Sequence, residues 1–164
     1  MPDDVVRPVD PMYRRKDSNQ VGYADSLPFL IISQESLEDL NSRLVEGGNY
    51  AVPMDRFRPN IVIAGGSPYI EDDLAVIDIG QVVFSLVKPC RRCVTVKTDQ
   101  LTGQVHSEEP LRTLETYRRR EDVAPWFKKE GIFFGWTAVH EIKTPSGSTT
   151  ISLENPLELI AYRG

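Results

Sequence analysis

The feature that most constrains the fold is a long run of strand-forming residues between Ala75 and Val87. β-Branched residues dominate this run and Gly80 interrupts it, so it predicts two strands joined by a tight turn. Further strand-like segments lie at residues 27–32, 61–64, 93–98, 132–139, 149–153 and 157–162. Their spacing is irregular and they do not alternate regularly with helices, which argues against a doubly wound parallel sheet. The pattern predicts a mainly β domain with helices, an α+β class built on a mixed, barrel-like sheet.

Two helices are expected among these strands. The first is capped by Ser33 or Ser36 and ends at Gly47, and its apolar residues recur at helical spacing at Leu37, Leu40 and Leu44. The second begins at Pro110 and has an apolar side formed by Leu111, Leu114 and Tyr117. Three arginines at residues 118–120 are expected to end it, because cations are favourable at a helix C-terminus.

Composition and charge set the outer limits on function. The chain has 164 residues, 40% of them hydrophobic and 26% charged, as expected for one soluble domain with a self-sufficient core. A formal charge of −5 argues against generic binding of nucleic acids. The longest apolar runs are too short to cross a bilayer and the N-terminus does not resemble a signal peptide, so we expect no membrane span and a cytoplasmic, reducing setting. Residues 1–22 are rich in proline and charge, which predicts an extended arm or linker before a domain at 23–164.

The only two cysteines lie in the stretch Lys88-Pro89-Cys90-Arg91-Arg92-Cys93. Nearby cations favour a thiolate over a thiol, so a reactive or metal-binding sulfur is expected here. Residues 93–98 alternate and predict a strand with its valines toward the core and Cys93 toward a polar cavity or groove. Pro89 favours a loop at Cys90, because proline cannot donate a backbone hydrogen bond.

Other interpretations of the cysteines are open at this stage. A buried, inert thiol is the commonest fate of a free cysteine. A structural zinc site needs two more ligands, and the only histidines, His106 and His140, are too far apart to form the usual second pair. A thioredoxin-like pair requires a helix after its first cysteine, and two cysteines are too few for a secreted disulfide scaffold.

Charged residues cluster in two further segments. Arg56, Arg58 and Asn60 come directly before the strand at 61–64, and an arginine fork can bind a phosphate or a carboxylate at two points. The alternative is a surface ion pair between Arg56 and Asp55 or a neighbour, which stabilises little. Residues 71–73 are all acidic and are expected to form a solvated turn rather than a metal site. A hairpin-type turn is expected at residues 99–103.

Taken together and in this order, several of these motifs resemble the MOSC domain, the C-terminal domain of molybdenum cofactor sulfurases. The matching segments are residues 25–29, 56–62, 71–72, 88–93, 98–99, 102–103 and 109–114. The branch that the chain most resembles is that of the mitochondrial amidoxime-reducing component and its bacterial relatives. The resemblance runs from about residue 1 to about residue 120 and implies a β-barrel-like fold that binds molybdopterin. The family as a whole is also associated with pyridoxal phosphate.

The resemblance implies roles for particular residues. Cys93 matches the essential cysteine, which ligates molybdenum or carries a sulfur. The residues expected to hold the cofactor are Arg58, Asn60, Arg92, Asp25, Ser26 and Leu27. A soft thiolate suits molybdenum or a persulfide, and cations suit a phosphate, so the chemistry of these residue types agrees. Phe134-Gly135-Trp136 and the segment after it depart from the family pattern, and Thr137 is a weak candidate.

Two functions follow from the resemblance. One is an oxidoreductase in which Cys93 binds molybdenum and the metal reduces N-hydroxylated or N-oxide substrates. The other is a sulfur-carrier module with a persulfide on Cys93. Relatives carry an upstream β-rich domain that supplies part of the phosphate site, so we expect the isolated chain to fold but to bind the cofactor poorly. The chain lacks a cysteine cluster for an iron–sulfur centre, so electrons are expected from another domain or protein.

Overall fold

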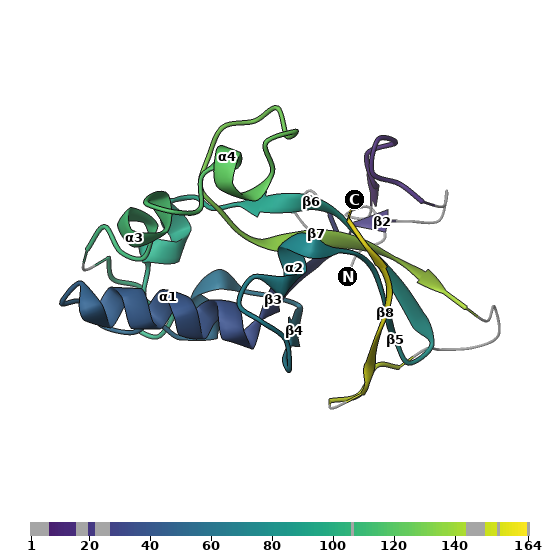
Figure 1. Cartoon of the computed structure of the whole chain (residues 1–164), viewed down its shortest axis with the longest axis horizontal. Coiled ribbons are helices and arrows are strands. Elements are labelled where there is room, and N and C mark those ends of the chain that lie inside the picture. Colours follow the sequence, from purple (N-terminus) through teal and green to yellow (C-terminus); the bar gives the residue numbers. More distant parts are fainter. Residues whose placement is uncertain are drawn as a thin grey trace.

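A mixed six-stranded sheet organises the chain (Figure 1). The computed structural model describes residues 7–15, 20–21, 27–105, 107–143, 150–153 and 155–163. The strand order is β4-β3-β7-β6-β5-β8, with β3 and β4 parallel and all other neighbours antiparallel. The strands are β3 (Phe29–Ser33), β4 (Ile61–Ile63), β5 (Leu74–Ile79), β6 (Val82–Arg91), β7 (Phe133–Ile142) and β8 (Leu157–Tyr162). The sheet curls into a half-barrel, which confirms the predicted α+β class.

Most predicted strands are present. The run 75–87 forms β5 and the first part of β6, and Gly80 at the turn between them has a φ of 62°, a conformation that glycine adopts without strain. The other confirmed strands are those at 27–32, 61–64, 132–139 and 157–162. The strand predicted at 149–153 is wrong for residues 150–153, which form none, and Thr149 lies outside the described residues.

The strand predicted at 93–98 is also wrong. Pairing of β6 with β7 ends at Arg91 opposite Phe133, so the chain beyond it has no neighbouring strand. Residues Val94–Lys97 instead form the 3₁₀ helix η3. Its period of three buries Val96 but leaves Val94 66% exposed, whereas a strand would have placed both on one face. Cys90, expected on a loop, lies in β6.

Helix α1 (Gln34–Glu46) is the first predicted helix. Ser33 is its N-cap, and the Ser33 hydroxyl accepts a hydrogen bond from the backbone N–H of Ser36 at 3.1 Å. Its leucines are buried in one apolar cluster with Ile32 and Phe134, and Gly47 ends it. In Figure 1 it lies with α3 at the end of the molecule opposite β5 and β8.

The second predicted helix is shorter than expected. It is α3 (Leu111–Glu115), with Pro110 at the N-cap and Leu114 buried, and α4 (Arg120–Val123) follows after a turn. The arginines at 118–120 do not simply end a helix. Arg118 is buried and forms an ion pair with Asp72, so tertiary pairing decides its place.

The acidic segment 71–73 is not a solvated turn. It forms α2 (Ile70–Asp73), and the Glu71 side chain is fully buried. The Glu71 carboxylate accepts hydrogen bonds from the Ser33 backbone N–H at 3.3 Å and the Ser36 hydroxyl at 2.8 Å, which joins α2 to the start of α1. The prediction of a solvated turn is wrong because it relied on the usual exposure of charge runs. Here buried donors from Ser33 and Ser36 satisfy the side-chain oxygens of Glu71.

Part of the predicted arm is paired within the domain. Strands β1 (Arg7–Pro8) and β2 (Gln20–Val21) form an antiparallel pair. Val9 and Val21 pack with Leu27 and Val139 in a small apolar cluster. The boundary at residue 22 stays a prediction. Among the described residues no helix is long and apolar enough to cross a bilayer.

Candidate functional site

Cys93 lies where β6 has ended and η3 begins. Its residue is exposed, as expected for a side chain outside the core, whereas Cys90 is only partly exposed within β6. The Cys93 sulfur lies 3.1 Å from the Thr95 hydroxyl oxygen. Hydrogen bonds from the Thr95 hydroxyl and backbone N–H, together with the nearby Arg92 cation, lower the pKa of the Cys93 thiol. The structure therefore places an accessible sulfur whose surroundings lower the pKa of the thiol.

Arg58 follows the 3₁₀ helix η2 (Met54–Phe57) in an unusual backbone conformation. Its φ of 54° and ψ of 48° are left-handed, which is uncommon for a residue other than glycine. The Arg58 side chain is exposed, and among the described residues it has no ion-pair or hydrogen-bond partner. This guanidinium can therefore bind an anion without first breaking an ion pair.

Asn60 joins the segment after η2 to the sheet. Its side-chain oxygen accepts a hydrogen bond from the Leu30 N–H at 2.8 Å, and its own N–H donates to the Leu30 carbonyl at 2.9 Å. These reciprocal bonds hold residue 60 beside β3 as β4 begins. Asn60 thus has a structural function in the free chain, and its predicted contact with a cofactor stays a prediction.

The Arg92 side chain points into the protein. Its Nε and Nη2 atoms donate to the Phe134 carbonyl at 2.9 and 2.7 Å, and Nη1 donates to the Phe57 carbonyl at 3.0 Å. Burial lowers the pKa of this guanidinium, which remains charged because its ordinary value is so high. These bonds use three of the five N–H groups of the guanidinium, and two remain that could donate to a cofactor. Direct contact of Arg92 with a cofactor stays a prediction.

A second arginine joins η2 to the end of η3. Arg56 donates to the Lys97 carbonyl at 3.2 Å and pairs with Asp99 at 3.1 Å, rather than with Asp55. Asp99 also accepts the backbone N–H groups of Leu101 and Thr102, which fixes the predicted turn at 99–103. The sequence interpretation predicted the turn that Asp99 opens, but it assigned neither Asp99 nor Thr95 to the site.

The remaining predicted residues precede β3. Asp25 and Ser26 lie outside the described residues. Leu27 is 3% exposed and packs in the cluster with Val9, Val21 and Val139. The structure therefore brings the elements carrying Arg58, Arg92 and Cys93 together at one junction, formed by η2, η3 and the adjoining ends of β6 and β7. We refer to this as the η2–η3 junction.

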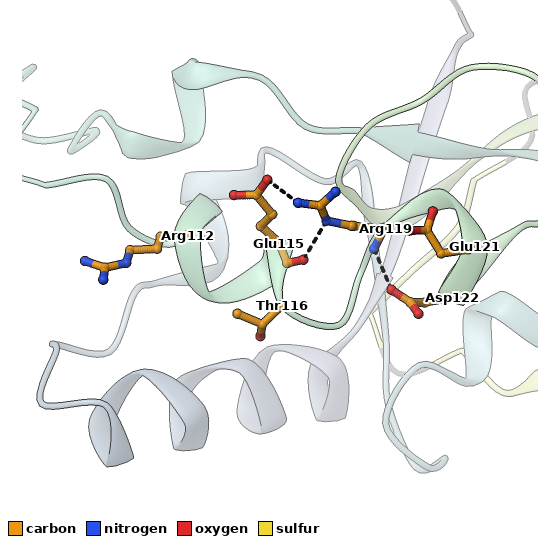
Figure 2. Close-up of a pocket in the computed structure, with 6 residues that line it drawn as sticks. All are labelled: Arg112, Glu115, Thr116, Arg119, Glu121 and Asp122. Carbon is orange, nitrogen blue, oxygen red and sulfur yellow. Dashed lines mark hydrogen bonds and ion pairs between the residues drawn. The ribbon is translucent and has the colours of Figure 1, made fainter.

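An open pocket lies elsewhere, on α3, α4 and the turn between them (Figure 2). Its lining residues are Arg112, Glu115, Thr116, Arg119, Glu121 and Asp122. The charges there are partly paired, because Arg119 donates to Glu115 at 2.8 Å and its backbone N–H donates to Asp122. Cys93 does not line this pocket, and within the described part of the chain no three His, Cys, Asp or Glu side chains gather as a metal site.

Comparison with known proteins places this geometry in a family. The model of the MOSC domain matches residues 18–153. The chain is 44% identical over 108 residues to the human mitochondrial amidoxime-reducing component 1, covering 66% of this chain and 30% of that protein. It is 42% identical over 127 residues to the molybdenum cofactor sulfurase of Oryza sativa subsp. japonica, covering 74% of this chain and 14% of that protein.

A third relative, the mouse mitochondrial amidoxime-reducing component 1, is 45% identical over 112 residues, covering 68% of this chain and 31% of that protein. The chain thus matches less than a third of the length of each of these three relatives. The family match itself extends over most of the chain and includes η2, η3 and strands β3 to β7 of the sheet. The chain belongs to the MOSC domain family.

Proposed function

We propose that this chain is the molybdenum-cofactor-binding domain of an oxidoreductase that reduces N-hydroxylated or N-oxide substrates. One observation carries the proposal: the exposed Cys93 thiol, whose pKa is lowered, lies at the start of η3, next to η2, and η2 is followed by Arg58, a cation without an ion-pair partner among the described residues. The similarity to amidoxime-reducing components favours this reaction class over others.

Each residue has a distinct part in this proposal. The Cys93 thiolate would ligate molybdenum, because a soft sulfur ligand suits this metal. The Arg58 guanidinium would bind the phosphate of the pterin through charge-assisted hydrogen bonds. The bound cofactor would supply the two-electron redox chemistry. Asn60 would keep residue 58 near the sheet, while Asp25, Ser26 and Leu27, which precede β3 in the sequence, are proposed to contact the cofactor.

The second candidate is a sulfur carrier with a persulfide on Cys93. The similarity to molybdenum cofactor sulfurase over 74% of this chain favours it, and an exposed thiolate is also what a persulfide site requires. Both candidates place their chemistry on the same sulfur, so only the species attached to it distinguishes them.

The proposal includes partners. We propose that a β-rich domain of the same parent protein completes the phosphate site and that a separate domain or protein donates electrons. We propose a reducing, cytoplasmic setting, since two cysteines are too few for a secreted disulfide scaffold. A parent protein longer than this chain agrees with the small share of each relative that the chain matches.

Metal analysis of protein from a host that makes the cofactor tests the proposal. We expect molybdenum in the protein when it is joined to its upstream β-rich domain, loss of it in Cys93→Ser, and retention of it in the matched control Cys90→Ser. Intact-mass measurement separates the alternative, because a persulfide adds one sulfur atom to Cys93. Molybdenum that is unchanged in Cys93→Ser would contradict the proposed ligand.

A second measurement tests the two-domain account. We expect the 164-residue chain alone to hold little molybdenum, because losing two phosphate contacts would cost roughly 3–6 kcal/mol of binding free energy. Adding the upstream β-rich domain should raise the metal content at equal protein concentration. Near one molybdenum per molecule in the chain alone would show that the site is complete without that domain.

A further inference from the structure

Arg92 forms several hydrogen bonds to the backbone of elements that are distant in sequence. Its guanidinium donates three hydrogen bonds of 2.7–3.0 Å to two carbonyls, and its own N–H donates to the Ile132 carbonyl at 2.8 Å. The guanidinium carbon also lies 5.4 Å from the centre of the Phe57 ring. A charged side chain with these partners is held in one orientation.

The two accepting carbonyls belong to the parts of the protein that carry the candidate site. The Phe57 carbonyl is in the peptide group that leads directly into Arg58, at the residue where the backbone becomes left-handed. The Phe134 carbonyl is in β7, beside the last pairs of β6. Arg92 itself directly precedes Cys93. One side chain thus joins the Arg58 bend, the sheet and the Cys93 segment.

We infer that Arg92 is a positioning residue, whose bridge between the Phe57 and Phe134 carbonyls sets where the Cys93 sulfur lies relative to the Arg58 side chain. This inference rests on the proposed function only in naming what the two side chains bind. Its geometric part stands on the contacts themselves. A lysine cannot replace the bridge, because an ammonium lacks the planar fork that reaches two carbonyls at fixed angles.

The chain offers a matched control in Arg118. This arginine is also buried and also donates from Nε to a neighbouring carbonyl of β7, that of Phe133, at 3.1 Å. Its other partner is Asp72 in α2, away from Cys93 and η2. Arg92→Lys and Arg118→Lys should both lower stability, so stability alone does not distinguish positioning from a general structural contribution.

The test attaches a nitroxide spin label to Cys93 in a Cys90→Ser background, without metal. We expect an ordered label in the parent protein, a clearly more mobile label in Arg92→Lys, and parent-like mobility in Arg118→Lys. Circular dichroism identifies the temperature range in which all three are folded. Equal mobility in Arg92→Lys and the parent would overturn the inference, and so would an equal increase in both lysine variants.

Molybdenum content, measured with Cys93 unlabelled and with the upstream β-rich domain joined to every variant and to the parent, links the positioning to the proposed function. Loss of a residue that orients a metal ligand commonly lowers metal affinity about tenfold to a hundredfold, so Arg92→Lys should retain much less molybdenum than Arg118→Lys. If the parent protein itself holds no molybdenum, the proposed function fails while the spin-label comparison still decides the positioning by Arg92. If both variants retain the parent's metal content, Arg92 does not act on the site.

Discussion

The η2–η3 junction and the α2 segment are both built from charged residues, yet they use charge in opposite ways. At the junction, Arg92 and Arg56 satisfy backbone carbonyls inside the protein, which leaves Cys93 and Arg58 exposed. In α2, Glu71 is fully buried and Asp72 pairs with buried Arg118. Charge at the junction therefore supports an accessible surface, whereas charge in α2 joins elements in the interior.

The place of the acidic segment 71–73 in the fold depends on partners that are distant in sequence, as the contacts of Asp72 show. Asp72 accepts two hydrogen bonds from Arg118 and one from the Trp136 indole N–H at 2.8 Å. Its backbone carbonyl accepts a further bond from Arg163 at 3.1 Å, near the end of the chain. These partners are 46 to 91 residues away, so no local pattern around Asp72 reveals them.

The largest effect should come from removing the Asp72 carboxylate. Asp72→Ala leaves the Arg118 cation buried without its counter-ion and the Trp136 N–H without an acceptor. We expect a loss of about 3–5 kcal/mol in the free energy of unfolding, measured by urea denaturation. The control is Asp73→Ala, because Asp73 is exposed, and it should change stability by less than about 0.5 kcal/mol. Similar losses in both variants would contradict the contrast between these two carboxylates.

At the junction, Arg58→Ala should affect binding rather than folding. Losing a charge-assisted hydrogen bond costs roughly 1.5–3 kcal/mol, which is about tenfold to over a hundredfold in affinity for the cofactor. Molybdenum retention during dialysis measures it, and the urea midpoint should stay near that of the parent. Arg58→Gly is the matched variant: it removes the same cation but relieves the left-handed backbone, so stability should rise by about 0.5–1 kcal/mol. A domain that unfolds in Arg58→Ala without a binding defect would make Arg58 structural.

Glu71 gives the α2 segment a contribution to stability that depends on pH. Burial raises the pKa of Glu71 above its ordinary value of 4.5, and the neighbouring Asp72 charge adds to this. Because the folded state holds this proton more tightly, the stability it contributes is present below pH 4.5 and is lost as pH rises through the folded pKa. The difference in unfolding free energy between the parent and Glu71→Gln should therefore fall with pH, by at most about 1.4 kcal/mol per unit. A constant difference from pH 4 to pH 8 would rule this out.

The smallest expected effect concerns the two thiols. Cys93 should react with iodoacetamide several-fold faster than Cys90 at neutral pH, because it is more exposed and its pKa is lowered. Peptide mapping after brief labelling measures the ratio. Thr95→Val should reduce the rate at Cys93, since it removes the hydroxyl that lies 3.1 Å from the sulfur. Equal labelling of both cysteines would remove the argument for a distinct sulfur site.

The local elements, and the residue types present at the η2–η3 junction, could be predicted from the amino-acid pattern alone. Strand-forming runs around Gly80 and the leucine spacing in α1 depend on neighbours a few residues away, so pattern alone predicted them. The exposed Cys93 and the cationic stretch before it were also visible, and so was the family to which these motifs belong.

The contacts of the charged side chains could not be predicted in this way, because they join elements that are distant in sequence. The inward orientation of Arg92 depends on carbonyls of η2 and β7, and the burial of Glu71 depends on donors at the start of α1. These partners are distant in sequence. The 3₁₀ helix at residues 94–97 likewise follows the point where pairing with β7 ends. Pairing of β6 stops at Arg91 because β7 begins opposite it at Phe133, and the chain must then turn. The alternation of residues 93–98 cannot predict where β7 begins, because the energy of strand pairing arises between strands rather than within one strand.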